Sequence, residues 1–494
     1  MSGSDVIVVG AGNAAMCAAL SAHEHGARVL VLERAQIDNR GGNSAHSGGS
    51  FRVVYRDMDD FKKLVPDLTP DEIRNSDFGT YTEEKYLDDL ARMSQYRCDP
   101  DLAEVLVKQS LPAALWMQKF GVRFIPIYGR QAFKVDGKFK FWGGLTVEVA
   151  GGGLGLMQTL FTAAEQRGMD VLYGARAVGL LTEKGRACGV RVIRNGESTD
   201  YPARAVVLGS GGFHANTEWR ARYLGPNWDL AKARGTRCNT GDGITMALDA
   251  GALSWGNWSG CHSVFFDRNA PDFGDLNLLN QQKNGFAQGI VVNALGKRFV
   301  DEGRDFRNYT YAQMGARILE QPGAIGYQVF DSKVIHLLPD EYRMKKMTKV
   351  QADTLEELVA GMDGIDAQGF LDEVKAFNAA VKREVPYVPA IKDHRCTVGL
   401  AINKSNWANP LDTPPYYAFG VTAGITCTYG GIRIDSDARV LSAEGPPIAG
   451  LYATGEMVGG LYYVNYPGGA GLMSGSVFGR IGGANAAAFA AGLK

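Results

Sequence analysis

The first 33 residues combine two short, wholly apolar runs with a stretch of small residues between them. Val6–Val9 and Val29–Leu32 are the lengths of strands, and each ends at a glycine or a polar residue, which predicts two buried parallel strands. Between them, residues 10–15 predict a sharp turn, and an alanine-rich helix follows to about His25. The pattern predicts a β-α-β unit whose second strand ends at Glu33.

Apolar and polar positions farther along the chain predict further α and β segments, separated by glycine-rich loops. Residues 55–120 have mainly amphipathic helical spacing, and a helix is expected over Gln158–Arg167. Three strands are expected at Val171–Leu181, Ala187–Arg194 and Arg204–Leu208. The last of these runs into the glycine pair of GSGGF, a second place where the backbone could approach a ligand closely.

From about Cys261 to Gly420 the pattern becomes more polar and mixed, with helical runs at Leu355–Gly361 and Phe370–Val381. The final 70 residues return to glycine-rich α/β texture and end in a long helix of small residues. The expected fold class is α/β, with a discontinuous Rossmann-like domain over residues 1–260 and 421–494. An α+β domain over residues 261–420 is inserted into it.

The loop after the first strand has the chemistry that a dinucleotide requires. Gly10 permits the turn, Gly12 lets the backbone approach a pyrophosphate, and the small side chain of Ala15 allows close packing of helix and strand. The helix amino terminus offers N–H groups and a positive dipole end to phosphates. Glu33 is placed to accept the hydroxyls of a ribose. The alternative is an ordinary β-α-β unit with a tight loop, and the motif does not identify the dinucleotide.

Composition narrows the class of protein. A chain of 494 residues is expected to form two or three domains with a large core. The 52 Lys and Arg residues against 53 Asp and Glu residues leave a net charge of −1, which excludes a global field for nucleic acid. Any anionic ligand must therefore be bound by local arginines. The 63 glycines cluster in GG and GxG groups, which favours close contacts between backbone and ligand.

The seven cysteines contain no CxxC pair, which argues against an iron–sulfur cluster, a zinc site or a disulfide framework. The seven histidines show no metal-ligand spacing. We find no signal-peptide pattern and no run of 18 apolar residues, so a reducing, cytoplasmic location is expected.

Taken together, the motifs along the chain are typical of one known family of proteins. In chain order the sequence carries GAGNAA, Glu33, GGNSAHSGG, GSGGF, TGDGI, NALGKRFVDE, GGIRID and LYATGE. This set resembles the fumarate reductase/succinate dehydrogenase flavoprotein superfamily over essentially the whole chain. The resemblance implies FAD in an extended pose beneath a mobile capping domain, and hydride transfer between flavin N5 and a carbon next to an electron-withdrawing group.

Two segments indicate a subgroup. RFVDEGRDFRNYTYAQMG and NYPGGAGLMSGSVFGRIGG look most like the FAD-dependent tricarballylate dehydrogenases, which desaturate a propane tricarboxylate to cis-aconitate. The YPGG element also resembles the 3-ketosteroid Δ1-dehydrogenases, so a keto substrate stays open.

The resemblance implies a set of residues that hold FAD, from the adenosine end to the flavin. They are Gly10, Gly12, Asn13, Ala14, Ala15, Glu33, Arg34, Gly42, Asn43, Ser44, Gly48, Gly49, Val178, Gly211, Gly212, Asp242, Gly455, Glu456, Leu472, Met473 and Ser474. In covalent members of the superfamily a histidine of the GGNSAHSGG-like loop bonds the flavin. Gly42 takes its place here and His46 lies four residues away, so non-covalent FAD is expected.

Desaturation next to a carboxylate needs a base, cationic groups that stabilise the developing charge, and a hydride acceptor. In the fumarate reductases an arginine shortly after RFxNE transfers the proton, and the ungapped match here is Phe306. A one-residue slip makes Arg307 the expected base, with Arg304 as a second candidate and Tyr309 and Tyr311 in reserve. The alternative is that both arginines only pair with nearby acids.

Two departures argue against fumarate itself. The histidine that the reductases carry before the GG of the GGIRID-like motif is missing from residues 425–428, and Tyr466 replaces an active-site arginine. Tyr466 matches the steroid-dehydrogenase tyrosine and could donate to a substrate oxygen, or could simply pack in a glycine turn. His262 is a candidate substrate ligand where the capping domain begins. Lesser candidates for carboxylate binding are Arg52, Arg234 and Arg237, and Cys427 is expected to be a buried thiol.

The leading hypothesis is an FAD-dependent dehydrogenase that desaturates a small polycarboxylate. Its electrons would pass to a separate acceptor, such as a membrane iron–sulfur/haem protein or a quinone, which would place the enzyme peripherally at the membrane. Three alternatives stay open: a desaturase or reductase of a cyclic ketone or other enone, including a fumarate-reductase-like enoate reductase; a flavin monooxygenase; and a non-catalytic flavin-binding module.

Overall fold

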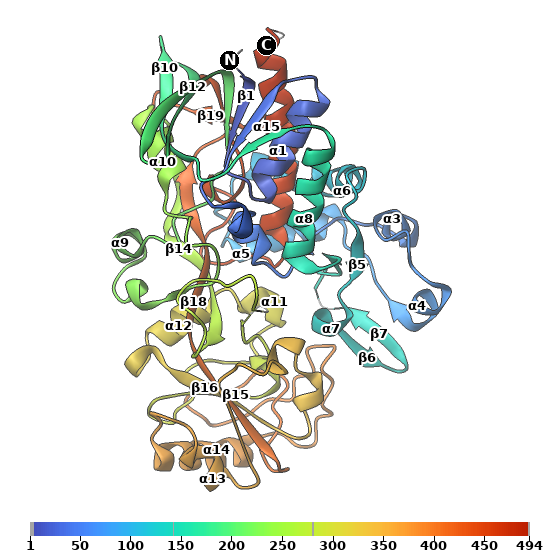
Figure 1. Ribbon diagram of the computed structural model, residues 1–494. Helices are drawn as coiled ribbons and strands as arrows, with labels where there is room; N and C mark the ends of the chain where they lie inside the picture. Colours follow the sequence, from blue (N-terminus) through green and yellow to red (C-terminus); the bar gives the residue numbers. More distant parts are fainter. Residues whose placement is uncertain (1–3, 142, 279–280, 493–494) are drawn as a thin grey trace.

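The computed structural model describes residues 4–141, 143–278 and 281–492 (Figure 1). A mixed sheet with a parallel centre forms its upper half, with β1 (Ser4–Val9) in the middle. β1 pairs with β2 (Val29–Leu32) on one side and β12 (Glu197–Leu208) on the other. β9 (Asp170–Leu172) and β20 (Pro447–Ala453) extend the sheet outwards. Since helices cover the central strands, their side chains are buried on both faces, which explains the continuous apolar runs in the sequence.

Two parallel helices pack against each other and against this sheet: α1 (Asn13–Glu24) and α15 (Ala470–Ala490) (Figure 1). Glycines four residues apart on α15, at positions 475, 479 and 483, face α1. A Cβ atom on Gly479 would lie 2.5 Å from the carbonyl oxygen of Ala14, so only glycine permits this approach. Asn13 Nδ2 donates to the Leu472 carbonyl at 2.9 Å, and both helix amino termini therefore lie at the same end of the sheet.

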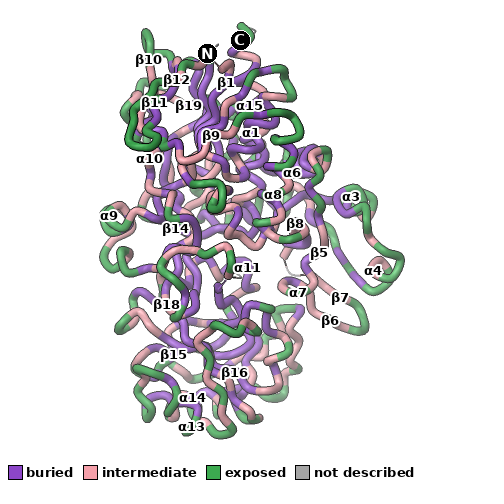
Figure 2. The backbone as a smooth tube through the Cα atoms, viewed as in Figure 1, coloured by how far each residue is buried: buried purple, intermediate pink, exposed green. Residues whose placement is uncertain are grey.

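The lower half is built on two long antiparallel strands, β14 (Ser254–Asp267) and β18 (Tyr416–Ile432). Figure 1 shows both strands running from the upper half into the lower half. Most of β18 and the second half of β14, from Gly260 on, are buried (Figure 2). β16 (Gly326–Asp331) pairs with β18. β14 and β18 cross the expected boundaries at 260/261 and 420/421, so the two halves share strands. The division into domains stays a prediction.

The remaining strands are β3 (Ser50–Phe51), β4 (Ser76–Asp77), β5 (Phe124–Pro126), β6 (Ala132–Val135), β7 (Lys138–Phe141), β8 (Val147–Val149), β10 (Arg176–Glu183), β11 (Arg186–Arg194), β13 (Lys232–Ala233), β15 (Ile290–Asn293), β17 (Lys349–Ala352) and β19 (Arg439–Leu441). The remaining α-helices are α2 (Gly42–Ala45), α3 (Met58–Leu64), α4 (Pro70–Asn75), α5 (Glu83–Met93), α6 (Pro100–Gln118), α7 (Tyr128–Gln131), α8 (Gly152–Gln166), α9 (Thr217–Trp219), α10 (Asp242–Asp249), α11 (Arg307–Thr310), α12 (Met314–Leu319), α13 (Leu355–Ala360) and α14 (Ala367–Ala380).

Most of the expected elements are present, with two differences. The single strand expected over Val171–Leu181 is wrong: β9 and β10 are separate, because the chain turns at Gly174 with φ +65°. The short strands β5 to β8, between residues 124 and 149, were not expected. Their polar and apolar residues are too mixed, as in the KFKF of β7, to give a clear alternating pattern.

Candidate active site

An elongated cavity lies at the carboxyl ends of β1 and β2. Its lining runs from Glu33 and Asp242 at one end to Tyr466 and Leu472 at the other, so the cavity suits a long ligand. Most of the residues expected to hold the cofactor line it: Gly10, Gly12, Asn13, Ala14, Glu33, Arg34, Gly42, Asn43, Ser44, Gly211, Asp242, Gly455, Glu456, Leu472 and Ser474.

The middle of the cavity is built by glycine backbone and a helix terminus. Gly10 has φ +99°, and a Cβ atom there would lie 2.5 Å from the carbonyl oxygen of Gly209. α1 begins directly after Gly12, whose residue type provides no side chain to cap the helix. Asn13 N donates to Ser44 Oγ at 3.0 Å, which fixes the facing loop. The exposed first turn of α1 at this point suits the phosphates of a dinucleotide.

One end of the cavity carries a buried carboxyl and a group of charged residues. Glu33 Oε1 accepts from the Ala35 amide at 2.6 Å, and burial raises the pKa of Glu33 to about 7. Asp242 pairs with Arg34 at 3.1 Å and with Arg176 at 2.8 Å, which closes this end with charged groups. A ribose hydroxyl is a natural donor to the Glu33 carboxylate.

Toward the other end, Glu456 ties four segments of the cavity wall together. Its carboxylate accepts from the amide of Thr428 at 3.0 Å, from Asn239 Nδ2 at 3.0 Å and from Asn43 Nδ2 at 3.4 Å. Burial raises the pKa of Glu456 to about 7. A Cβ atom on Gly212 would collide with this carboxylate, so Gly212 acts by leaving room for Glu456.

Several expected cofactor residues lie outside the lining of this cavity. β10 reaches it through Ala177, and the register shift after Ala177 leaves Val178 one position beyond it. Ala15 packs against the backbone at Gly209, and Gly49 packs against Gly152 at the start of α8. Met473 is buried within α15. Gly212 is likewise not part of the lining, and Gly48 lines the neighbouring cavity instead.

A second cavity, with an empty volume of about 760 Å³, adjoins the first. The two cavities share the lining residues Ser47, Thr426, Cys427, Tyr466 and Leu472. Arg130, Arg234 and Arg307 line it together with the carboxyl of Glu341, and Arg130 also pairs with Glu148. The lining therefore carries a net positive charge. Its position places a small anion directly beside whatever occupies the near end of the first cavity.

Arg307 is the first residue of α11 and is 6% exposed. One of its guanidinium nitrogens donates to the carbonyl oxygen of Arg130. Burial, and to a lesser extent the charge of Arg130, lower the pKa of Arg307 to about 10, although Glu341 opposes this shift. A guanidinium with a lowered pKa exchanges a proton more readily than an exposed one.

His262 and Tyr466 lie against each other in the second cavity, with ring centroids 4.9 Å apart. Neither ring nitrogen of His262 has a hydrogen-bond partner within the described part of the chain. Burial lowers the pKa of His262 well below its usual range, so the ring is neutral at pH 7. Tyr466 Oη accepts from the amide of Gly471 at 2.8 Å, which leaves its own proton available to a ligand.

Two other candidates lie elsewhere. Arg304 is exposed and donates to Gln313 Oε1 at 2.9 Å, because it precedes the turn that buries α11. Tyr309 does not line the second cavity: its hydroxyl donates to Asp89 at 2.9 Å and also reaches the Gly143 carbonyl at 2.9 Å. Tyr311 does line it, and burial raises the pKa of Tyr311 to about 12.

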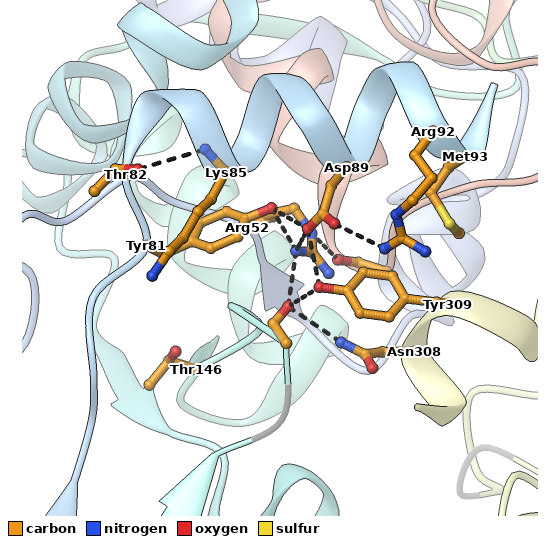
Figure 3. Close-up of polar contacts among 12 residues, drawn as sticks. Arg52, Tyr81, Thr82, Lys85, Asp89, Arg92, Met93, Thr146, Asn308 and Tyr309 are labelled. Atoms are coloured by element: carbon orange, nitrogen blue, oxygen red, sulfur yellow. Dashed lines mark hydrogen bonds and ion pairs between the residues drawn. The ribbon is translucent and has the colours of Figure 1, made fainter. Parts of the chain in front are cut away.

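A buried polar network holds α11 in place (Figure 3). Arg52, fully buried, pairs with Asp89 of α5 at 3.1 Å, and Asp89 in turn accepts from Tyr309 of α11. Arg52 Nε also donates to the carbonyl of Gly468 at 2.8 Å, two residues after Tyr466. The network therefore fixes the segments that carry Arg307 and Tyr466 relative to each other.

Sequence reasoning underrated or missed three residues of the second cavity. Arg234 was only a lesser candidate, yet its Nη1 donates to Thr426 Oγ1 at 2.8 Å on the cavity wall. Arg130 and Glu341 were not singled out. They lie in short polar segments, α7 and the turn at Asp340–Tyr342, whose local patterns resemble ordinary surface loops. Cys427 lines both cavities, and Arg52 supports the site through the network described above. Arg237 lines neither cavity.

Comparison with known proteins connects these two cavities to a family. The sequence pattern of a family described as an FAD binding domain matches residues 5–472. The chain belongs to this family. It is a member of the fumarate reductase/succinate dehydrogenase flavoprotein superfamily, and its cofactor is FAD.

The sequence similarity to known relatives extends over most of this flavoprotein. It is 30% identical over 494 residues to a fumarate reductase (cytochrome) from Shewanella frigidimarina, with 98% of this chain and 77% of the relative covered. It is 29% identical to the 4-oxocyclohexanecarboxylate 2-dehydrogenase of Sinomonas cyclohexanicum, with 94% and 89% covered. The crystal structure of 3-ketosteroid delta1-dehydrogenase from Sterolibacterium denitrificans in complex with 1,4-androstadiene-3,17-dione matches with a TM-score of 0.74, 25% identity, and 98% and 99% covered.

The flavoprotein is thus an FAD-dependent oxidoreductase that acts on C–C bonds, and the expected α/β fold with FAD is confirmed. The first cavity fits FAD by its length, its glycine wall at Gly10 and its buried carboxyl at Glu33. His46 lines neither cavity, and the non-covalent attachment of FAD stays a prediction. Among the described residues, no helix has the length and apolarity to cross a membrane. The same part of the chain has no cluster of three or more His, Cys, Asp or Glu suited to a metal.

Proposed function

We propose that this flavoprotein desaturates a C–C bond next to a carboxylate of a small polycarboxylic acid, as in the conversion of tricarballylate to cis-aconitate. The observation that carries this proposal is the second cavity, where Arg130, Arg234 and Arg307 converge beside the FAD cavity. Guanidinium groups bind carboxylates through paired, always-charged hydrogen bonds, and no other side chain suits this task as well.

The chain's own residues supply the proton chemistry. Arg307 removes the α-proton, and its pKa of about 10 makes the neutral base more accessible than in an exposed arginine. Arg234 and Arg130 hold carboxylate oxygens and stabilise the charge that develops on them. Tyr466 donates a hydrogen bond to a further substrate oxygen. Its own oxygen accepts from the Gly471 amide, which leaves the hydroxyl proton directed at the ligand. Neutral His262 offers one donor and one acceptor to the same ligand.

Bound FAD supplies the capacity to accept a hydride. Gly10, Gly12, Asn13 and Glu33 would hold its adenosine and pyrophosphate, and the first turn of α15 would lie near the flavin. The electrons then pass to a separate acceptor, a haem or iron–sulfur protein or a quinone. The relative named fumarate reductase (cytochrome) supports this assignment.

A second candidate is the desaturation of a cyclic ketone. Tyr466 favours it, since a buried hydroxyl with its proton free to donate is suited to polarising a carbonyl. The relatives named 4-oxocyclohexanecarboxylate 2-dehydrogenase and 3-ketosteroid delta1-dehydrogenase act on ketones by their names. The first of these names describes a substrate with both a ketone and a carboxylate, which the arginines could also bind.

Anaerobic mixing of the holoenzyme with a panel of acids and ketones tests the proposal. Loss of the oxidised flavin absorbance with tricarballylate, and appearance of cis-aconitate, would support it. Reduction by cyclic ketones that lack a carboxylate, with none by any polycarboxylic acid, would favour the second candidate and contradict the first.

A further inference from the structure

The second cavity contains buried oxygen atoms that accept no hydrogen bond. Glu341 Oε2 is one of them, in a residue that is 9% exposed, and Asn308 Oδ1 is another, in a residue that is 1% exposed. Asn284 Oδ1 and Gln131 Oε1 are in the same condition, and all four residues line this cavity. None of these four oxygens accepts a hydrogen bond from any residue that the structure describes. A buried acceptor without a partner costs free energy, so these atoms point to a ligand that donates to them.

The orientation of the Asn308 amide is fixed by its surroundings. Its Nδ2 donates to the Gly143 carbonyl oxygen at 3.3 Å. The same oxygen also accepts hydrogen bonds from Tyr309 Oη and from an Arg52 nitrogen. Exchanging the amide oxygen and nitrogen would place two oxygens against each other there. Asn308 therefore presents its oxygen, not its nitrogen, to the remaining space.

Glu341 restricts the chemistry of the ligand more than Asn308 does, because a carboxylate accepts hydrogen bonds and repels other carboxylates. It lies in a turn at Asp340–Tyr342, and its backbone carbonyl accepts from Lys283 Nζ at 3.1 Å. Lys283 itself pairs with Asp267 at 3.4 Å. An ionised carboxylate of a substrate finds its partners at the arginines and would meet repulsion at Glu341.

We propose that the substrate of this enzyme carries a hydrogen-bond donor in addition to its carboxylates, and that Glu341 binds this donor. The donor is a hydroxyl, so the inference favours a hydroxylated polycarboxylic acid over tricarballylate itself. The cavity then has two functional ends: arginines for anionic oxygens, and Glu341 with Asn308 for the donor. This inference rests on the proposed function and narrows its substrate class.

Matched ligand pairs test the inference directly. Citrate is tricarballylate with one added hydroxyl, and malate is succinate with one added hydroxyl. The holoenzyme is titrated anaerobically with each acid, and the half-saturating concentration is read from the change in flavin absorbance, whether by perturbation or by reduction. We expect the hydroxy acid of at least one pair to bind about tenfold more tightly or better, because buried acceptors discriminate strongly against an analogue that lacks the donor.

Glu341→Gln is the decisive variant. Its amide can donate to an acid without a hydroxyl, so the preference within that pair should fall about tenfold, toward equality. Glu384→Gln, an exposed carboxyl outside both cavities, should retain the wild-type ratio. Equal binding within both pairs in the wild-type enzyme, or an unchanged ratio in Glu341→Gln with flavin still bound, would overturn the inference. Failure of all four acids to perturb the flavin would contradict the proposed function itself.

Discussion

At the scale of single residues, the proposal that Arg307 is the base rests mainly on how its position differs from that of Arg304. The two arginines are three positions apart, yet one is exposed and the other lines the cavity beside Tyr466 and Glu341. Each is followed by a short polar residue, Asp305 or Asn308. The burial of α11 places them in different surroundings, which makes them a natural experimental pair.

Arg307→Ala should slow flavin reduction by the substrate about 10²–10⁴-fold, the usual contribution of a positioned acid or base. The FAD content should be unchanged, since Arg307 does not line the first cavity. Stopped-flow absorbance under anaerobic conditions measures the rate. Arg304→Ala should reduce at the wild-type rate, and a similar loss in both variants would contradict the assignment.

The raised pKa of Glu33 predicts that FAD binding depends on pH. Without the cofactor, burial raises its pKa to about 7, and ribose hydroxyls would stabilise the ionised form and lower this pKa. Binding therefore releases a proton below pH 7, and the affinity for FAD should rise by up to about tenfold per pH unit between pH 5.5 and 7 and then level off. Flavin fluorescence titration measures it.

The control for this dependence is Glu33→Gln, which keeps the shape of the side chain but cannot ionise. It should bind FAD more weakly at pH 8 and with a shallower pH dependence. Glu456 also has a raised pKa of about 7, so some slope should persist in this variant. An affinity that is independent of pH in the wild-type protein would show that Glu33 does not titrate on binding.

At the scale of secondary-structure elements, the contact between α1 and α15 sets the shape of the FAD cavity. Both helices begin at its wall, and glycines on α15 bring the two backbones into contact. Gly479→Ala should force the helices apart, cost about 1–3 kcal/mol of stability and weaken FAD binding. Thermal unfolding with and without FAD measures both effects.

Gly482→Ala is the matched control on the same helix. A Cβ atom there would meet the side chains of Ala438, at 3.2 Å, and Tyr452, at 3.9 Å, rather than backbone. It should lower the unfolding temperature less than Gly479→Ala and leave FAD binding unchanged. Equal behaviour of the two variants would mean that the helix contact does not shape the cavity.

The network around Arg52 should position α11 (Figure 3). Tyr309→Phe removes the hydrogen bond to Asp89 and should destabilise the protein by about 1–3 kcal/mol. It should also lower the rate of flavin reduction, because Arg307 lies on the same short helix. In a double-mutant cycle with Asp89→Asn, the effects on this rate should be less than additive. Full additivity would indicate that the two residues act separately.

The local elements around the first cavity could be predicted from the sequence, because they are continuous segments with distinctive patterns. Residues 6–33 and the terminal α15 are examples, since apolar runs, glycines and small residues specify each of them. The break at Gly174 was missed because a single glycine does not interrupt the apolar alternation around it.

At the scale of the whole molecule, the second cavity could be predicted only in part. Arg130, Arg234, His262, Arg307, Glu341 and Tyr466 lie in segments far apart along the chain. The pairing of β14 with β18 brings some of them together, for example by placing His262 opposite Cys427. Such long-range register has no local signature, so the resemblance to a family named Arg307, Tyr466 and His262, while Arg130 and Glu341 needed the structure.

The central claim is that the arginine-lined cavity binds a polycarboxylic acid that reduces the flavin. The most direct measurement is anaerobic reduction of the holoenzyme by small polycarboxylic acids, tricarballylate first, in parallel with cyclic ketones. The account predicts that an acid bleaches the flavin and that the corresponding unsaturated acid forms in equal amount. A flavin that stays oxidised with every acid, and is bleached by a ketone without a carboxylate, would contradict it.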